Sequence, residues 1–246
     1  MAQITAAIIG TNAGYLLLTF LPPILWLLFY LREDAHPEPK RFLLLTFVGG
    51  MASAFLALAA ECAWIFVNSG SCFQSVSPAT NPLVLFFGIA VIEEYVKYLP
   101  VKFFILGRKD FDEPIDAMVY MMTAALGFAA LENALFLIPL FHDSFLSGIQ
   151  VTANRFLGAN LLHALSSGIV GFFLARAFFS HYRHHFLTLG ILLASILHTA
   201  FNYFILIMET SSQGTYYIIL LLSTMAVMVF IDFEKLKSKD GSTRAP

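Results

Sequence analysis

The chain alternates between long apolar stretches and short polar connections. Runs of about 20 apolar residues match the length at which an α-helix crosses the hydrocarbon core of a bilayer. A helix suits that environment because it satisfies its own backbone hydrogen bonds. The pattern predicts seven membrane-spanning helices, at residues 12–31, 42–67, 82–106, 115–139, 157–180, 185–208 and 214–232. An eighth span, or one re-entrant segment, is compatible with the same pattern.

Ionisable residues interrupt these apolar stretches at a few positions. Residues 42–96 contain no Lys or Arg, and their carboxylates are Glu61 and the adjacent pair Glu93 and Glu94. A charge at the middle of a bilayer costs about 3 kcal/mol or more, so such residues are candidates for function. Later apolar stretches hold three more of them: Glu132, His163 and His198.

The composition indicates an integral membrane protein. Of the 246 residues, 59% are hydrophobic and 12% are charged, and the mean hydropathy is +0.77. Soluble domains average about 25% charged residues. We therefore predict an all-α polytopic membrane protein, with one transmembrane domain over residues 1–233 and a short basic tail over 234–246. The formal net charge of −2 does not indicate a nucleic-acid partner.

Basic residues are distributed unevenly between alternate connections. They occur at 32–41, after the third apolar stretch, around the end of the fifth and in the C-terminal tail, whereas the other connections contain only Arg155. Connections rich in Lys and Arg stay in the cytoplasm. The distribution predicts that the N-terminus lies outside and the C-terminus lies in the cytoplasm.

The two cysteines, Cys62 and Cys72, fall near and within the connection at 68–81. In the predicted orientation this connection lies outside the cell, where a disulfide can form. The sequence leaves two interpretations open, a disulfide or two unpaired small residues.

The glutamate pair shares one predicted helix with Lys97. Lys97 follows Glu93 by four residues and Glu94 by three, so it can pair with either carboxylate. Adjacent residues on a helix point about 100° apart. One glutamate can therefore face a cavity as a general base for water while the other holds Lys97. The sequence does not decide which glutamate has which role.

The other ionisable residues come from three further helices. Counted at ~1.5 Å per residue, Glu132, His163 and His198 fall at overlapping depths, from the middle of the membrane toward the outside. Two imidazoles and a carboxylate are typical protein ligands of a catalytic zinc with one open position. We expect this trio to bind Zn²⁺ and Glu93 or Glu94 to deprotonate the metal-bound water. The metal assignment rests on this placement alone, because the HExxH signature is absent.

Four polar residues are predicted to support this cluster. Asn202 follows His198 by four residues and Ser167 follows His163 by four, so each pair shares a helix face. We expect Lys97, Asn133 and Ser167 to hydrogen-bond the reacting groups, and Asn202 to do the same or to stabilise an oxyanion.

Several short motifs resemble those of one protein family. In chain order they are His36-Pro-Glu-Pro39, Glu93-Glu-Tyr-Val-Lys97, Phe111-Asp-Glu-Pro-Ile-Asp116, Gly127-Phe-Ala-Ala-Leu-Glu-Asn133, His163-Ala-Leu-Ser-Ser167 and His198-Thr-Ala-Phe-Asn202. Together they resemble the PrsW-type intramembrane proteases over about residues 30–205.

The resemblance carries expectations about function. PrsW-type proteases are related to the type II CAAX-prenyl endopeptidases and bacteriocin-processing proteins of the ABI superfamily, which use the motifs EExxR, FxxxH and HxxxN. This chain has Lys97 in place of that Arg and Glu132 in place of that His, so the relatives' mechanism does not transfer unchanged. The resemblance implies site-1 cleavage of a membrane-anchored anti-sigma factor, or a similar single-span protein, in a stress response at the bacterial cytoplasmic membrane.

Other functions can use the same residues. A glutamate-type protease would activate water without a metal, and a proton-coupled transporter would use the Glu and His residues as a relay. A purely structural ion pair at Lys97 would leave one glutamate unpaired at high cost. A transporter predicts polar residues along a path through the membrane, whereas these residues cluster at one depth. The clustering favours a protease.

Overall fold

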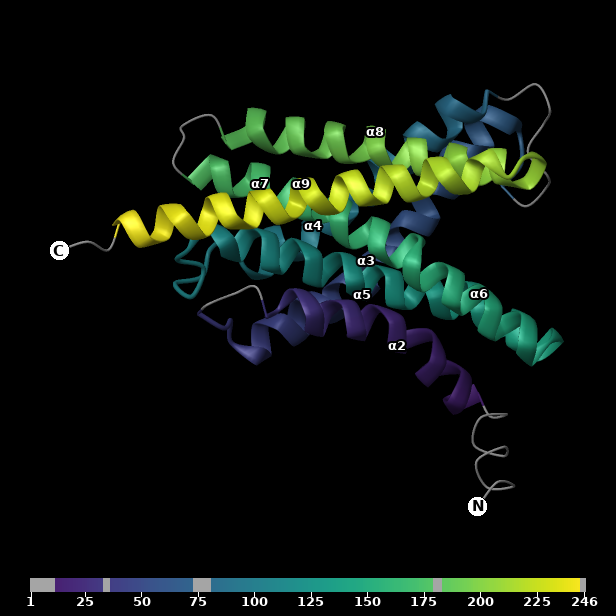
Figure 1. Cartoon of the computed structure of the whole chain (residues 1–246), viewed down its shortest axis with the longest axis horizontal. Helices are drawn as coiled ribbons and strands as arrows, with labels where there is room; N and C mark the ends of the chain where they lie inside the picture. The colour runs from purple at the N-terminus through teal and green to yellow at the C-terminus, as the bar shows by residue number, and fades with distance from the viewer. Residues whose placement is uncertain (1–11, 33–35, 73–80, 179–182, 244–246) are drawn as a thin grey trace, which may run out of the picture.

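A computed structural model of the chain describes residues 12–32, 36–72, 81–178 and 183–243. Within these residues the protein is all-helical (Figure 1). The helices are α2 (Asn12–Tyr30), α3 (Lys40–Ser69), α4 (Pro82–Phe104), α5 (Pro114–Asp143), α6 (Phe145–Leu157), α7 (Ala159–Phe178), α8 (Arg183–Thr210) and α9 (Gln213–Thr243).

Each of the seven predicted spans corresponds to one of these helices, which confirms the polytopic helical fold. Six stretches are long and apolar enough to cross a membrane on length and composition alone, with α6 and α7 counted as one stretch. The exception is α4, because its middle carries Glu93, Glu94 and Lys97. Helix α4 has 23 residues, so it is long enough to cross a membrane. Its charged side chains, and not its length, distinguish it from the other six stretches.

The short helix α6 is not among the predicted spans. Polar residues recur along it, so the sequence shows no apolar run there. The helix begins at an N-cap, Ser144, whose side chain accepts a hydrogen bond from the Ser147 backbone N–H. At the other end of the chain, α9 continues to Thr243, so the predicted basic tail at 234–246 begins inside a helix.

Helix α5 runs through the middle of the bundle (Figure 1). It packs against α2, α3, α4, α6, α7 and α9. Every residue from Glu113 to Ala130 is buried, so this stretch has no lipid-facing side. A helix that is apolar all round is suited to such a central position. Glu132, Asn133 and Phe128 are therefore held on a helix that neighbours fix from all sides.

Glycines allow the helices around α5 to approach closely. A Cβ atom on Gly50 of α3 would overlap the Ala124 backbone carbonyl, and one on Gly127 of α5 would overlap the Phe47 carbonyl. Gly171 of α7 makes a similar approach to the Met118 backbone. Small residues at these positions thus allow close packing of membrane helices.

Two of the motifs meet at the end of α5 where the helix begins. Glu113 is the N-cap of α5, and its backbone N–H donates to the Asp116 carboxylate. His36 pairs with Glu113, with Nδ1 3.1 Å from Oε1. The Tyr120 hydroxyl donates to the buried Glu38 carboxylate. Residues 36–39 and 111–116 thus join α3 to α5, at the opposite end of α5 from Glu132.

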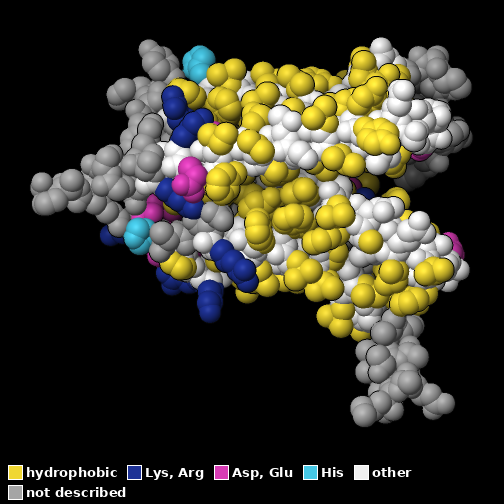
Figure 2. All heavy atoms as spheres, in the orientation of Figure 1, with side chains coloured by type: hydrophobic (Ala, Val, Ile, Leu, Met, Phe, Trp, Pro, Cys, Tyr) yellow, Lys and Arg dark blue, Asp and Glu magenta, His cyan; other side chains and the backbone are white. Residues whose placement is uncertain are grey.

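Charged side chains gather at one end of the molecule, and an apolar band crosses the face seen in Figure 2. The described basic residues at this end include Lys40, Arg41, Arg108, Lys109 and Lys235, which lie at or near helix ends. The grouping agrees with the alternation read from the sequence. The orientation of the protein in a membrane stays a prediction.

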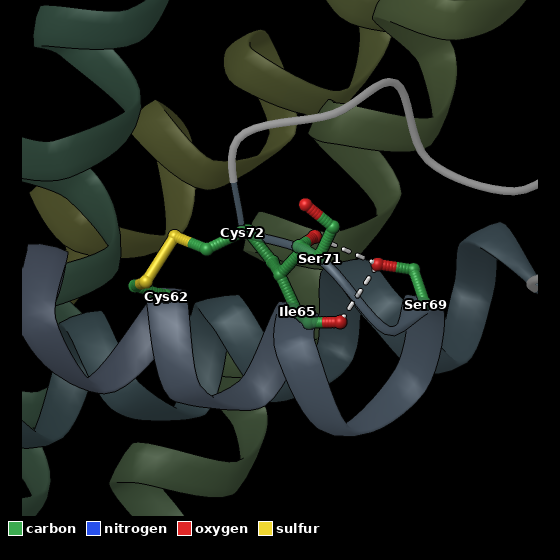
Figure 3. Close-up of a disulfide and its surroundings, with 5 residues drawn as sticks. All are labelled: Cys62, Ile65, Ser69, Ser71 and Cys72. Atoms are coloured by element: carbon green, nitrogen blue, oxygen red, sulfur yellow. Dashed lines mark hydrogen bonds between the residues drawn. A yellow bond between two sulfur atoms is a disulfide. The ribbon is translucent and has the colours of Figure 1, made fainter.

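A disulfide joins Cys62 of α3 to Cys72 (Figure 3). Helix α3 ends at Gly70, which has a φ of 79° and so turns the chain back toward Cys62. The Ser69 hydroxyl donates to the Ile65 and Ser71 carbonyls, which orders the same turn. Of the two interpretations that the sequence left open, the structure has the disulfide.

We predict that Gly127→Val will lower the free energy of unfolding by about 1–3 kcal/mol, because the added side chain must separate α3 from α5. The midpoint of thermal unfolding in detergent measures this effect. Gly107→Val is the matched control, since no atom lies within 4 Å of the position of a Cβ on Gly107. An equal change in both variants would contradict the interpretation.

Candidate active site

A buried ammonium group lies at the centre of the polar cluster. Lys97 Nζ donates to Glu93 Oε2 at 3.0 Å and to Glu94 Oε1 at 2.9 Å. It also lies 2.8 Å from His163 Nδ1 of α7 and 4.6 Å from the centre of the Phe128 ring of α5. The Lys97 side chain is 0% exposed. The ammonium is therefore satisfied by two carboxylates, an imidazole and an aromatic face, as a buried charge requires.

Glu94 is surrounded by hydrogen-bond donors. Its Oε1 accepts from Lys97, from Ser166 Oγ at 3.0 Å and from His198 Nδ1 at 3.1 Å. Its Oε2 accepts from Ser167 Oγ at 3.2 Å. The side chain is fully buried. Glu94 thus joins α4 to α7 and α8 and has no face open to a reactant.

Glu93 faces a small cavity instead. The cavity measures about 70 Å³ and opens between α3 and α5. Its wall contains Glu93, Glu132 and Glu61, together with Ala54 and Ala57. Glu61 was not among the predicted site residues. One glutamate of the adjacent pair therefore faces space for a small molecule while the other is enclosed, as the divergence of neighbouring helical residues requires.

His163 lies between two carboxylates. Its Nε2 is 2.8 Å from Glu132 Oε2, and its Nδ1 is 2.8 Å from Lys97 Nζ and 3.7 Å from Glu93 Oε2. A carboxylate can only accept a hydrogen bond, whereas an ammonium can only donate one. Nε2 therefore donates its hydrogen to Glu132, and Nδ1 accepts from the Lys97 ammonium. The lone pair of His163 points to the side of Glu93 and Lys97.

In His198 the two ring nitrogens have exchanged roles compared with His163. Its Nδ1 donates to Glu94, and its Nε2 lies 3.9 Å from Glu93 Oε2. The two imidazole rings are 5.4 Å apart between centres and nearly perpendicular. Each histidine thus uses one nitrogen on a carboxylate and turns the other toward Glu93. This is the arrangement by which outer carboxylates orient metal-ligating histidines.

Glu93, His163 and His198 could hold a metal ion. One ligand atom from each lies within 4.8 Å of the others, and all three residues are buried. The predicted trio had Glu132 in place of Glu93. Glu132 instead pairs with Arg155 of α6, whose NH2 lies 3.0 Å from Glu132 Oε2. Glu132 as a metal ligand stays a prediction, and the geometry favours Glu93.

The chemistry of this donor set fits a divalent cation. Three carboxylates, Glu93, Glu94 and Glu132, face two cations, Lys97 and Arg155. With neutral histidines the cluster retains one negative charge. An ion bound there would compete with the Lys97 ammonium for Glu93 and His163, because Lys97 lies within 3.0 Å of both.

The structure brings most of the predicted site residues into one network. Glu93, Glu94, Lys97, Glu132, His163, Ser167 and His198 are linked by the contacts described above. Asn133 makes no direct contact with the histidines; it joins the network through its hydrogen bond with Arg155. Asn202 is half-buried one helical turn beyond His198 and makes no hydrogen bond with a described residue.

Sequence reasoning missed three participants. Ser166 donates to Glu94, and Arg155 and Asn160 join the network from α6 and α7. Arg155 left one signal, since it is the single Lys or Arg in the connections predicted to lie outside. Ser166 lies inside the His163–Ser167 motif, and Asn160 left no signal, because small polar residues are common in membrane helices.

Comparison with known proteins identifies the family. Residues 38–231 match the family described as "PrsW family intramembrane metalloprotease". The chain belongs to the PrsW family. The matched region includes every residue of the polar cluster and confirms the resemblance read from the motifs.

Individual PrsW relatives are similar over most of their length. "Protease PrsW" of Geobacillus kaustophilus is 32% identical over 74% of this chain and 74% of its own. That of Oceanobacillus iheyensis is 30% identical over 90% and 94%, and that of Bacillus subtilis is 30% identical over 78% and 80%. No solved structure matches the chain. The protein is thus an intramembrane peptidase that acts on membrane-embedded substrates, which decides against the transporter.

We predict that Lys97→Met will destabilise the protein by about 3–5 kcal/mol, because two buried carboxylates lose their shared cation. Thermal unfolding in detergent measures the loss. Adding Glu94→Gln to Lys97→Met should recover part of it, since the second change removes one unpaired charge. The control is Lys109→Met, at an exposed lysine. Additive effects of the two changes would contradict the ion-pair interpretation.

Proposed function

We propose that the protein is an endopeptidase that cuts a single-span membrane protein by attack of water activated by Glu93. The observation that supports this proposal is the position of Glu93, which lines the cavity and lies beside both histidines. Carboxylates serve as general bases when they reach the water they deprotonate. Glu94 lacks that access because donors surround both of its oxygens.

The family description includes the word metalloprotease, and the donor set of Glu93, His163 and His198 agrees with it. Carboxylate and imidazole ligands with an open position are typical of catalytic zinc. A bound zinc ion would supply Lewis acidity and make water more acidic. In this proposal Glu93 has two tasks, to help hold the ion and to accept the proton from water.

The remaining residues of the cluster prepare the reacting groups. Lys97 balances the charge of Glu93 and Glu94 and donates a hydrogen bond to each carboxylate. Glu94 orients His198, and Glu132 orients His163. Asn202 has its amide unengaged by described residues and is the group proposed to donate to an oxyanion.

A metal-free version of the reaction has one specific observation in its favour. The Lys97 ammonium lies between Glu93 and His163, so a positive charge is present at the centre of the site without a metal. In this version Glu93 and His163 would activate water directly. Metal analysis separates the two versions.

The proposed substrate is a membrane-anchored anti-sigma factor or a similar single-span protein in a bacterial cytoplasmic membrane. Two features support a cut near the extracytoplasmic end of the substrate helix. His163 is the fifth residue of α7, at the end away from the basic residues, and the cavity opens beside Glu61 of α3, next to Cys62. The predicted orientation places that end outside.

We expect Glu93→Gln to lower the rate of cleavage of a reconstituted single-span substrate by about 100-fold or more, as loss of a general base does. His163→Ala and His198→Ala should have similar effects. Glu209→Gln is the matched control, because Glu209 is exposed near the end of α8. Wild-type rates in Glu93→Gln liposomes would overturn the proposal.

We expect purified protein to contain about one zinc ion per chain, and His163→Ala and His198→Ala to lose it. Elemental analysis of the variants identifies the carboxylate ligand. If Glu132→Gln retains zinc and Glu93→Gln loses it, the result supports Glu93, His163 and His198 as the ligands. The opposite result supports the trio predicted from the sequence, with Glu132 in place of Glu93. Full activity after removal of all metal would support the metal-free version.

A further inference from the structure

Arg155 connects the short helix α6 to the active site. Its NH2 lies 3.0 Å from Glu132 Oε2, and the same oxygen lies 2.8 Å from His163 Nε2. A single carboxylate oxygen therefore lies between the guanidinium and the imidazole. The Arg155 side chain is 15% exposed and that of Glu132 is 37% exposed, so the guanidinium is the more enclosed partner of this ion pair.

A closed ring of hydrogen bonds fixes Arg155 in this position. Arg155 Nε donates to Asn133 Oδ1 at 2.6 Å, and Asn133 Nδ2 donates to Asn160 Oδ1 at 2.9 Å. Asn160 Nδ2 then donates to the Arg155 backbone carbonyl at 2.9 Å. The ring joins α5, α6 and α7. The guanidinium is thus held in place before any substrate binds.

The ion pair limits where the Glu132 carboxylate can point. Glu132 also lines the cavity with Glu93 and Glu61, and without a cation it could turn into that space. Repulsion from these two carboxylates would then act on it. With Arg155 present, Oε2 stays against His163 Nε2. The His163 ring consequently keeps its orientation, with Nδ1 toward Lys97 and Glu93.

We propose that Arg155 is a positioning residue of the peptidase, which acts through Glu132 to fix the orientation of His163. The inference rests on the proposed roles of Glu93 and His163 in the reaction. The alternative is that Arg155 only stabilises the packing of α6 through the asparagine ring. The alternatives differ in whether the effect of Arg155 depends on the charge of Glu132.

A double-mutant cycle distinguishes them. Arg155→Ala should lower kcat by about 10–100-fold, as is typical for groups that orient a functional histidine, and change KM less than about twofold. In a Glu132→Gln background the same change should alter kcat less than about threefold. Arg155→Lys should recover part of kcat, since lysine restores the positive charge but not the planar set of N–H donors of the guanidinium. Arg176→Ala is the matched control, at an exposed arginine on the helix that carries His163.

Equal factors in the two backgrounds, or an unchanged kcat in Arg155→Ala, would overturn the inference. A second measurement does not depend on turnover. Nitrogen NMR of ¹⁵N-histidine-labelled protein, with the His163 signals assigned by their loss in His163→Ala, should show hydrogen on Nε2 in the wild type and a shifted Nε2 resonance in Arg155→Ala. An unchanged Nε2 resonance in the variant also overturns it.

Parallel measurements separate this inference from the proposed function. If Glu93→Gln and His163→Ala cleave at the wild-type rate, the proposed function fails and the inference fails with it. If both lose activity while Arg155→Ala does not, the inference alone fails. Unfolding midpoints of all variants are compared, and a loss of kcat counts only in variants that stay folded at the assay temperature.

Discussion

The structure depends on one interaction, the sharing of the buried Lys97 ammonium between Glu93, Glu94 and His163. Helix α4 carries three charged residues in its middle, which an isolated helix could not hold inside a membrane at low cost. The groups that stabilise these charges are Phe128 of α5, His163 of α7 and His198 of α8. Besides its proposed part in catalysis, the ion cluster has a structural effect. It requires these helices to pack together, so the assembled bundle and the completed site are one event.

Helix α5 provides the complementary constraint. Its first half is buried on every side, and glycines remove the side chain where the backbones of α3 and α7 approach it. Gly127 lies five residues before Glu132, so the α3 contact fixes the helix close to the site. Apolar packing thus sets the distances within which the polar groups must find partners, and the polar groups select that packing over others.

The sequence predicted the helices and most of the site because both leave local signals. Apolar runs of the right length mark spans, and charges inside them mark function. The i, i+3 and i, i+4 spacings predicted that Lys97 can pair with either glutamate, and it pairs with both. The choice of metal-ligating carboxylate could not be made this way. It depends on Arg155, which lies on a helix with no apolar run, and on side-chain directions that set Glu93 toward the cavity and Glu94 away from it.

The size of the cavity has a consequence for turnover. A cavity of about 70 Å³ exceeds the roughly 15 Å³ that a single water molecule needs. Each peptide bond hydrolysed consumes one water molecule, so water has to enter again in every cycle. The small side chains of Ala54 and Ala57 form part of the cavity wall on α3. Larger side chains at these two positions would occupy the space from which that water comes.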